Sequence, residues 1–128
     1  CLRVIPGSHR SQRLTQHAKE DRDHLVLNQR VVDGEFDEST AVDIELQAGQ
    51  MSLHDVYLIH GSNPNHSPHR RAGLAIRYMP ATSLFDRHST ADGTGAGYAV
   101  YFSNRPIWLL RGNDQNGQND FVVGHQHD

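Results

Sequence analysis

The sequence predicts an all-β domain, a sandwich or a barrel, and three observations lead to this prediction. Residues 42–46 alternate apolar and charged side chains with a period of two, which is typical of a strand with one face in water. Other short apolar runs are separated by Pro, Gly, Asn and Asp, the residues that form turns. The chain shows few helical periods and no regular alternation of strands with helices, so a parallel α/β sheet is not expected.

The expected strands follow one another along the first two thirds of the chain. The first ends at the turn formers Pro6 and Gly7, and the last has the clearest strand pattern. A further turn is expected at Asp33 and Gly34. The strands are expected at residues 1–5, 25–27, 42–46, 56–60 and 71–79.

The remaining segments are expected to be loops or surface structure. Residues 8–24 contain too few apolar side chains for a buried helix, so they predict a loop or a short surface helix. Residues 89–97 are polar and rich in Gly, which predicts a mobile loop. Residues 112–128 are interpreted as a polar, mobile tail. The apolar strip at 107–110, which includes Trp108, is interpreted as packing.

Composition limits the class of protein. A chain of 128 residues fits one domain, and a net charge of −3 with neutral His makes no basic surface, so nucleic acid is not an expected partner. No apolar run approaches the roughly 18 residues of a membrane span, and no secretory segment is recognisable, so no membrane partner is expected. Cys1 is the only cysteine, which excludes an internal disulfide, and a cytoplasmic location is expected.

The N-terminus favours a piece of a longer polypeptide. The chain does not begin with Met, and residues 1–5 already have the pattern of a strand. A mature lipoprotein also begins with cysteine, but such chains continue into a flexible linker, and this one does not. The few expected strands cannot cover both faces of their own sheet. A missing N-terminal half, or a second copy of the chain, is therefore expected to cover it.

Residues 54–71 carry the candidate chemistry. His60 ends an apolar run, where a fixed backbone can aim its imidazole, and the turn at Gly61 and Ser62 leaves space beside the ring. Arg71 follows eleven residues later and opens the next expected strand. If the loop between them closes a hairpin-like connection, the two side chains come near each other.

The strand pattern after Arg71 predicts a slot. Arg71 would share its face of the strand with Gly73, Ala75 and Arg77, since side chains alternate between the two faces. Small residues beside an inward guanidinium leave room for a slender carboxylate, which the planar fork can bind through two hydrogen bonds. A shift of one residue would turn Arg70 inward instead, so Arg70 is the competing candidate.

Most of the chain resembles the phytanoyl-CoA dioxygenase family, which consists of Fe(II)/2-oxoglutarate-dependent oxygenases, and the resemblance is specific in two separated places. Residues 1–9, Cys-Leu-Arg-Val-Ile-Pro-Gly-Ser-His, resemble the loop motif of that family. His60-Gly61-Ser62 followed by Arg71 resembles its second iron histidine and its 2-oxoglutarate arginine. Residues 49–80 are similar to bacterial members throughout. Leu110-Arg111-Gly112 with Asp114 is similar to their C-terminal end.

The resemblance implies a double-stranded β-helix (a jelly roll, cupin-like), of which residues 1–128 would be the C-terminal portion of a single domain. In such enzymes two histidines and a carboxylate hold Fe(II), and the open positions take 2-oxoglutarate and O2. His60 would be the distal iron ligand and the catalytic residue. Arg71 would bind the distal carboxylate of 2-oxoglutarate, and Ser62 would add a hydroxyl to that site. The implied reaction is hydroxylation of a small organic substrate, with 2-oxoglutarate converted to succinate.

The sequence departs from the family at the first ligand pair. The family takes its other two ligands from a His-x-Asp motif upstream of the Pro-Gly-Ser-His loop, and the chain contains neither His-x-Asp nor His-x-Glu. His54 and Asp55 are adjacent, so in a strand they would point to opposite faces. The alternative is therefore a non-catalytic jelly-roll remnant or an oligomeric binding module. Halogenating relatives carry a small residue in place of the carboxylate, so the choice between hydroxylase and halogenase stays open.

The other histidines have plainer interpretations. His9 and Ser8 are interpreted as fixing the loop, and His54 as an ordinary strand histidine or as support for a ligand. His66 and His69 are expected to be exposed. A rival interpretation is a zinc site, although the spacings match no standard zinc finger. Its candidate ligands would be His60, His66, His69, His125 and His127.

Overall fold

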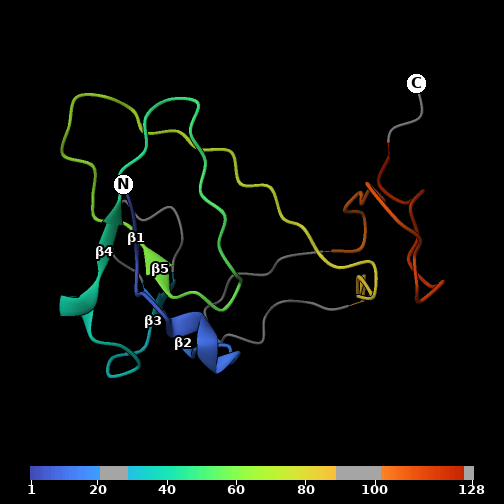
Figure 1. Ribbon diagram of the computed structural model, residues 1–128, viewed down its shortest axis with the longest axis horizontal. Helices are drawn as coiled ribbons and strands as arrows, with labels where there is room; N and C mark the ends of the chain where they lie inside the picture. The colour runs from blue at the N-terminus through green and yellow to red at the C-terminus, as the bar shows by residue number, and fades with distance from the viewer. Residues whose placement is uncertain (21–28, 89–101, 126–128) are drawn as a thin grey trace. The chain divides into compact units, whose positions relative to one another are not determined.

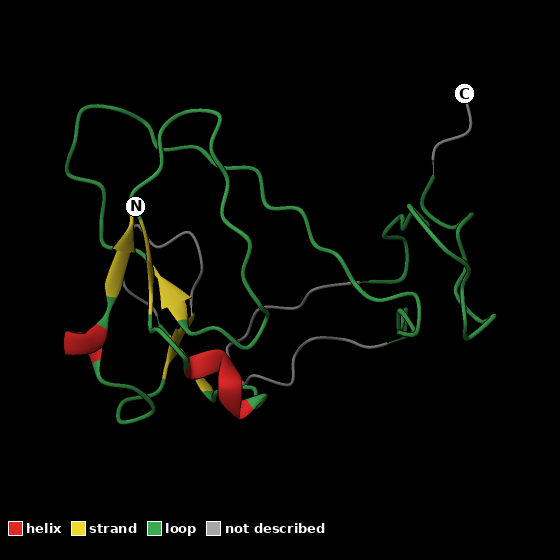
Figure 2. Cartoon of the chain, in the orientation of Figure 1, coloured by secondary structure: helices red, strands yellow, loops and turns green. Residues whose placement is uncertain are grey.

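The computed structural model of the protein describes residues 1–20, 29–88 and 102–125 (Figure 1). Two compact units make up the chain, Cys1–Leu74 and Ala75–Asp128. Helix in the described residues is limited to two short 3-10 turns, and strands and loops form the rest (Figure 2). The all-β class is therefore confirmed, while the jelly-roll arrangement stays a prediction. The strand expected at 25–27 and the loop expected at 89–97 lie outside the described residues.

A three-stranded antiparallel sheet with the order β4-β1-β5 organises the first unit (Figure 1). β1 (Leu2–Val4) is its central strand, flanked by β4 (Val42–Ile44) and β5 (His60–Gly61). The strands expected at 1–5 and 42–46 are confirmed with shorter ends. Alternation at 42–46 works as predicted, because Asp43 and its two apolar neighbours face opposite sides of the sheet.

The register gives this sheet one apolar and one polar face. Directly opposed residues of an antiparallel pair share a face, and Leu2 pairs with Ile44, while Val4 pairs with both Val42 and His60. The apolar face therefore carries the His60 side chain among four aliphatic ones. The polar face carries Arg3, Asp43 and the position of Gly61.

A second sheet pairs β2 (His17–Lys19) with β3 (Gln29–Val31) in antiparallel register. The 3-10 turns are η1 (Ser8–Ser11) and η2 (Glu38–Thr40). The expectation of a loop or short surface helix over 8–24 holds at η1 and is wrong at β2, and residues 21–24 lie outside the described residues. β2 has no hydrophobic alternation that could have predicted it, and its pairing with β3 is accompanied by ion pairs of Arg30 with Glu20 at 3.5 Å and with Asp33 at 2.7 Å.

The strand expected at 71–79 is wrong, although it had the clearest pattern. None of these residues is in a strand, and the apolar side chains of Leu74, Ile76 and Tyr78 are 87%, 62% and 70% exposed. Alternation alone cannot make a strand, since its backbone N–H and C=O groups need a neighbouring strand to pair with. The described residues offer this segment no such neighbour.

The strand expected at 56–60 is wrong except at its last residue. Asp55 starts a turn, in which its Oδ1 accepts the N–H of Tyr57 at 2.8 Å and its carbonyl accepts the N–H of Leu58 at 3.1 Å. An Asp side chain that binds the backbone two residues on competes with a sheet ladder for the same N–H. Because of this turn, β5 begins only at His60.

The second unit is held by polar side chains that bind backbone groups. The Arg87 guanidinium donates to the carbonyl oxygens of Arg105 and Asp120, both at 2.7 Å. Asn119 donates to the carbonyl of Ser83 at 2.9 Å and to Asp114 at 2.8 Å, and this side-chain hydrogen bond lowers the pKa of Asp114. These contacts join residues 83–87 to residues 105–120. The mobility of the tail stays a prediction.

Packing in the second unit includes an edge-on contact between the Trp108 and His125 rings, whose centroids lie 4.8 Å apart. Trp108 is nevertheless 65% exposed, and Leu109 and Leu110 are 44% and 72% exposed, so the interpretation of the strip at 107–110 as packing stays a prediction. Across the described ranges, helices are too short and too polar to cross a bilayer.

Gly124 provides a stability test of the second unit. Its φ is +82°, and a Cβ there would overlap the carbonyl oxygen of Asn104 and lie 2.8 Å from the nitrogen of Pro106. Gly124→Ala should therefore lower the free energy of unfolding by more than about 2 kcal/mol, from the left-handed backbone and the overlap together. Gly117→Ala is the control, because φ there is +62° and the space is open. It should lose only about 1 kcal/mol. Equal losses in thermal unfolding would contradict the close approach.

Candidate functional site

His60 occupies the first position of β5, where it pairs with Val4 of β1. Its side chain is exposed and lies on the apolar face of the three-stranded sheet. Aliphatic side chains of β1 and β4 share that face. The pairing of β5 with the central strand fixes the backbone of His60, as the backbone of a metal ligand must be fixed.

A hydrogen bond to the backbone sets the tautomer of His60. Its Nδ1 lies 2.7 Å from the carbonyl oxygen of Leu58. A carbonyl oxygen can only accept, so Nδ1 must carry the proton and donate. In the neutral ring the lone pair is then on Nε2. Metal-binding histidines commonly have this arrangement, with one nitrogen donating to a backbone carbonyl while the other binds the metal.

The Pro-Gly-Ser sequence forms a tight turn directly after β1. The N–H of Ser8 donates to the carbonyl of Ile5 at 3.2 Å, and Gly7 has φ 82° and ψ −7°. Pro at the second position and a left-handed Gly at the third are the signature of a type II turn. A residue with a side chain would be strained at Gly7, so the motif specifies the turn.

This turn holds both backbone groups of Ile59, the residue before His60. The Oγ of Ser8 accepts the N–H of Ile59 at 2.9 Å, and the N–H of Ile5 donates to the carbonyl of Ile59 at 2.9 Å. The two segments are 51 residues apart in sequence. The interpretation of Ser8 as a residue that fixes the loop is therefore confirmed, and what it holds in place is the entry to β5.

His54 is the aromatic neighbour of His60. The two ring centroids lie 5.1 Å apart with the ring planes at 58°. The turn that starts at Asp55 brings the rings together by reversing the chain between them. His54 therefore belongs to the surroundings of His60, and its interpretation as an ordinary strand histidine is wrong because it lies in no strand.

Arg3 connects β1 to its neighbours on the polar face of the sheet. Its Nη1 donates to Glu38 Oε1 and to Asn63 Oδ1, both at 3.3 Å. Its Nε lies 2.9 Å from Asp43 Oδ1 in an ion pair whose N–H is not aligned for a hydrogen bond. Because Asn63 follows β5 closely, Arg3 fixes the chain after His60 as the turn at Pro6 fixes the chain before it.

Hydrogen bonds within the loop between β5 and Arg71 fold it on itself. Asn65 Oδ1 accepts the N–H and the hydroxyl of Ser67 at 3.0 and 2.7 Å, and Asn65 Nδ2 donates to the carbonyl of His69 at 2.7 Å. His66 and His69 are exposed, as expected. The loop thus has a defined local shape on the way to Arg71.

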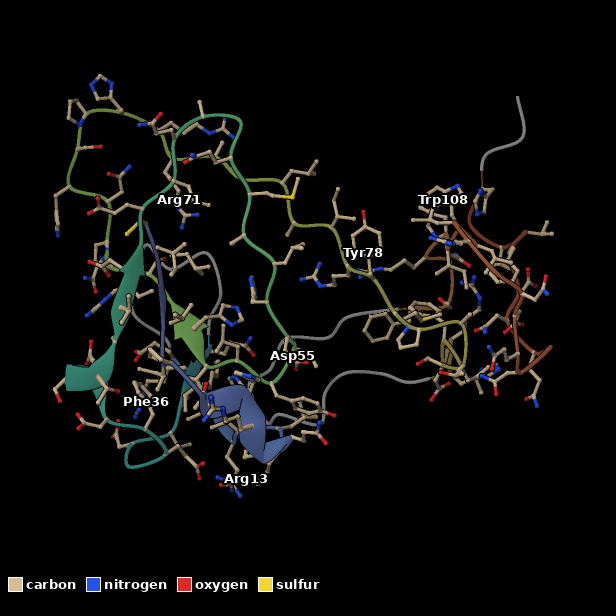
Figure 3. The ribbon with its side chains drawn as sticks, in the orientation of Figure 1. Arg13, Phe36, Asp55, Arg71, Tyr78 and Trp108 are labelled. Carbon is tan, nitrogen blue, oxygen red and sulfur yellow. The ribbon has the colours of Figure 1, made fainter. Side chains whose placement is uncertain are left out.

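Arg71 and Ser62 are both exposed and lie in the loop that follows β5. Figure 3 shows Asp55 in the turn before β5 and Arg71 in the connection after it. The predicted slot rested on a strand at 71–79, and without that strand the alternation of Arg71 with Gly73, Ala75 and Arg77 does not apply. Arg70 is exposed as well, so the choice between the two arginines stays a prediction. The roles of Arg71 and Ser62 stay predictions too.

A complete metal centre is not formed by the described residues. Within residues 1–20, 29–88 and 102–125, no three His, Cys, Asp or Glu side chains form a group that could hold a metal ion. The zinc alternative has no support among its described members, and His127 lies outside them. For an iron site, His60 fits as one ligand through Nε2, and the remaining ligands are not found in these ranges.

Comparison with known families gives the family of the chain. The family model described as phytanoyl-CoA dioxygenase (PhyH) matches residues 1–73, more than half of the 128 residues. The chain belongs to the phytanoyl-CoA dioxygenase family. The match includes the turn at Pro6, β5 and Arg71, which are the parts that carried the resemblance. Neither the curated proteins nor the solved structures include a match to the chain.

Family membership suggests an oxygenase at the level of the family. Two contributors to the surroundings of His60 were not foreseen, the carbonyl of Leu58 and the peptide N–H of Ile59. Backbone groups leave no side-chain signal in a sequence. The Pro-Gly-Ser motif could have pointed to them only if its partner segment had been known.

The tautomer of His60 can be tested directly. In the neutral imidazole of the metal-free protein, Nδ1 should carry the proton and Nε2 should not, because the Leu58 carbonyl can accept but not donate. Long-range ¹⁵N–¹H correlation spectra distinguish the two nitrogens. A ring protonated on Nε2 alone would contradict the hydrogen bond. His69, in the exposed loop, serves as the reference histidine in the same spectrum.

Proposed function

We propose that the protein is an Fe(II)/2-oxoglutarate-dependent dioxygenase that hydroxylates a small organic substrate, with His60 as an iron ligand. The observation that supports this most strongly is the state of the His60 ring, since Nδ1 is bound to a backbone carbonyl and Nε2 keeps its lone pair. Membership of the phytanoyl-CoA dioxygenase family supports the same assignment. Nε2 of this exposed side chain would be the atom that binds Fe(II).

The residues after His60 would bind the cosubstrate. Arg71 would hold the distal carboxylate of 2-oxoglutarate through its planar guanidinium, and Ser62 would donate its hydroxyl to the same site. Support for Arg71 comes from its place inside the matched region and from the absence of any hydrogen bond or ion pair that engages it within the described ranges. Its guanidinium is therefore available to an anion.

The apolar face of the sheet would keep the site dry. Val4 pairs with His60 on that face, and the aliphatic side chains of β1 and β4 extend the face away from His60 on one side. Apolar walls strengthen the electrostatic interactions of a bound anion and exclude water from reactive intermediates. When bound, iron supplies the activation of O2 that couples conversion of 2-oxoglutarate to succinate with oxidation of the substrate. The chain would contribute the iron ligand, the site for the 2-oxoglutarate anion and an apolar surface that excludes water.

The other two iron ligands would come from outside these 128 residues. The sequence contains no His-x-Asp and no His-x-Glu. A further segment of the same polypeptide, or a second copy of the chain, would supply them and would also cover the apolar face. Whether the third ligand is a carboxylate or a small residue would decide between hydroxylation and halogenation.

The iron assignment predicts the effect of His60→Ala in the full-length protein. Because Nε2 is lost, Fe(II)-dependent formation of succinate from 2-oxoglutarate should fall by at least about a hundredfold, the upper part of the range for disturbed metal sites. Succinate is measured by mass spectrometry over time. His69→Ala, an exchange in the exposed loop, is the control and should keep wild-type turnover. Unchanged succinate formation in His60→Ala would remove the proposal.

The cosubstrate assignment predicts a different signature for Arg71→Gln. Loss of a bidentate, charge-assisted interaction costs roughly 1.5–3 kcal/mol of binding free energy. The KM for 2-oxoglutarate should therefore rise by at least about tenfold. Iron affinity should stay as in the wild type. Arg70→Gln is the matched control, since it removes the same charge one residue away. If Arg70→Gln raises the KM and Arg71→Gln does not, the two roles are exchanged.

A further inference from the structure

One peptide group joins the Pro-Gly-Ser turn to the His60 ring. The N–H of Ile59 and the carbonyl of Leu58 belong to the same planar peptide unit. The N–H donates to Ser8 Oγ at 2.9 Å, and the carbonyl accepts from His60 Nδ1 at 2.7 Å. A continuous path of hydrogen bonds therefore runs from the Ser8 hydroxyl through one rigid plane to the imidazole.

We infer that Ser8 is a positioning residue for His60, which acts on the imidazole through the Leu58–Ile59 peptide. The inference rests on the proposed function, because it assigns to Ser8 an effect on the metal ligand. The Ser8 hydroxyl bonds to the Ile59 N–H and not to the ring itself. Its hydroxyl oxygen sets the tilt of the peptide plane, and the tilt sets the direction of the carbonyl that holds Nδ1.

Planarity makes the coupling between the two hydrogen bonds strong. A trans peptide resists twisting, with about 1 kcal/mol for a deviation near 12° in ω, so the N–H and the C=O must rotate together. If the Ser8 hydroxyl is removed, the plane is free to rock about the flanking Cα atoms. The carbonyl of Leu58 then loses its fixed direction, and the His60 ring loses the partner that orients it.

The same path also changes the electronic character of the ring. Hydrogen bonds in a chain polarise one another, by roughly 10–30% per bond in condensed-phase estimates. A donor bond on the N–H of a peptide makes its carbonyl a better acceptor, and a stronger bond at Nδ1–H makes Nε2 a better electron donor to a metal. Ser8 would thus affect both the aim and the basicity of the ligand atom.

Ser8 is not needed to hold the two segments together, because other backbone bonds do so. The N–H of Ile5 donates to the Ile59 carbonyl at 2.9 Å, and β1 pairs directly with β5 at Val4 and His60. These bonds hold the two segments together without the Ser8 side chain. Removing the hydroxyl should therefore leave the sheet intact and alter the orientation of the peptide.

The test compares two serine hydroxyls of the same 3-10 turn in the full-length protein. Ser8→Ala removes the bond to Ile59, whereas Ser11→Ala removes only local bonds, from Ser11 Oγ to the Ser8 carbonyl at 3.1 Å and from the Arg13 N–H to Ser11 Oγ at 3.4 Å. Co(II) serves as the probe, and its affinity is measured by titration of its visible absorption. Ser8→Ala should weaken Co(II) binding about tenfold, and Ser11→Ala should leave it unchanged.

Two further variants separate positioning from general stability. Ser8→Thr keeps the hydroxyl and should restore wild-type affinity. In a protein that already carries His60→Ala, adding Ser8→Ala should change the residual Co(II) affinity no further, because the ring on which Ser8 acts is gone. If Ser8→Ala does not fold, Ser8→Cys takes its place, since a thiol keeps the approximate volume but accepts a hydrogen bond only weakly.

The outcomes distinguish this inference from the proposed function. Loss of Co(II) binding in His60→Ala, with equal affinities in Ser8→Ala, Ser11→Ala and the wild type, overturns the role of Ser8 and leaves the metal site standing. Wild-type Co(II) binding in His60→Ala overturns both. A tenfold loss in Ser8→Ala that Ser8→Thr restores, without further loss in the His60→Ala background, supports the positioning role.

Discussion

The peptide group between Leu58 and Ile59 is the constraint on which the candidate site depends. Its N–H is held by the Ser8 hydroxyl and its carbonyl holds the His60 ring. A side chain at the end of a two-residue strand would otherwise have little to fix it, because β5 is short and His60 is exposed. Binding a metal with one chosen nitrogen requires that the ring neither flip nor change tautomer.

The rest of the first unit supports that peptide from both sides. β1 lies between β4 and β5, and its continuation into the turn at Pro6 places Ser8 against Ile59. On the opposite face of the sheet, the Arg3 guanidinium reaches Asn63 just after β5. The Pro-Gly-Ser segment therefore has a physical task, which is to hold the strand that carries His60, the proposed metal ligand.

The sequence predicts parts of this arrangement well and others poorly, for identifiable reasons. The strand at 1–5, the turn at Pro6 and Gly7, and the strand at 42–46 were predictable because local residue types determine them. A strand at 71–79 was predicted wrongly, because alternation is a local signal and a strand also needs a neighbouring strand to pair with. The turn at Asp55 was missed because an apolar run outweighed one Asp side chain that binds the backbone.

The candidate site divides in the same way. His60 could be singled out as a candidate from its place at the end of an apolar run and from the family resemblance. The match over residues 1–73 bears out that resemblance at the level of the family. The tautomer of His60 could not be predicted, because it depends on a backbone carbonyl, that of Leu58, and its link to Ser8 could not, because that contact joins segments 51 residues apart. The position of Arg71 relative to His60 depended on the strand that did not form, so it stays a prediction.

Amide hydrogen exchange at Ile59 tests the central claim most directly. If the Ser8 hydroxyl holds this N–H, exchange at Ile59 should be slowed to about the same degree as at Ile5, whose N–H donates to the Ile59 carbonyl. The amide of the exposed Leu53 should exchange near its intrinsic rate in the same experiment. Exchange at Ile59 as fast as at Leu53 would mean that the peptide is free, and the account of how His60 is aimed would fail.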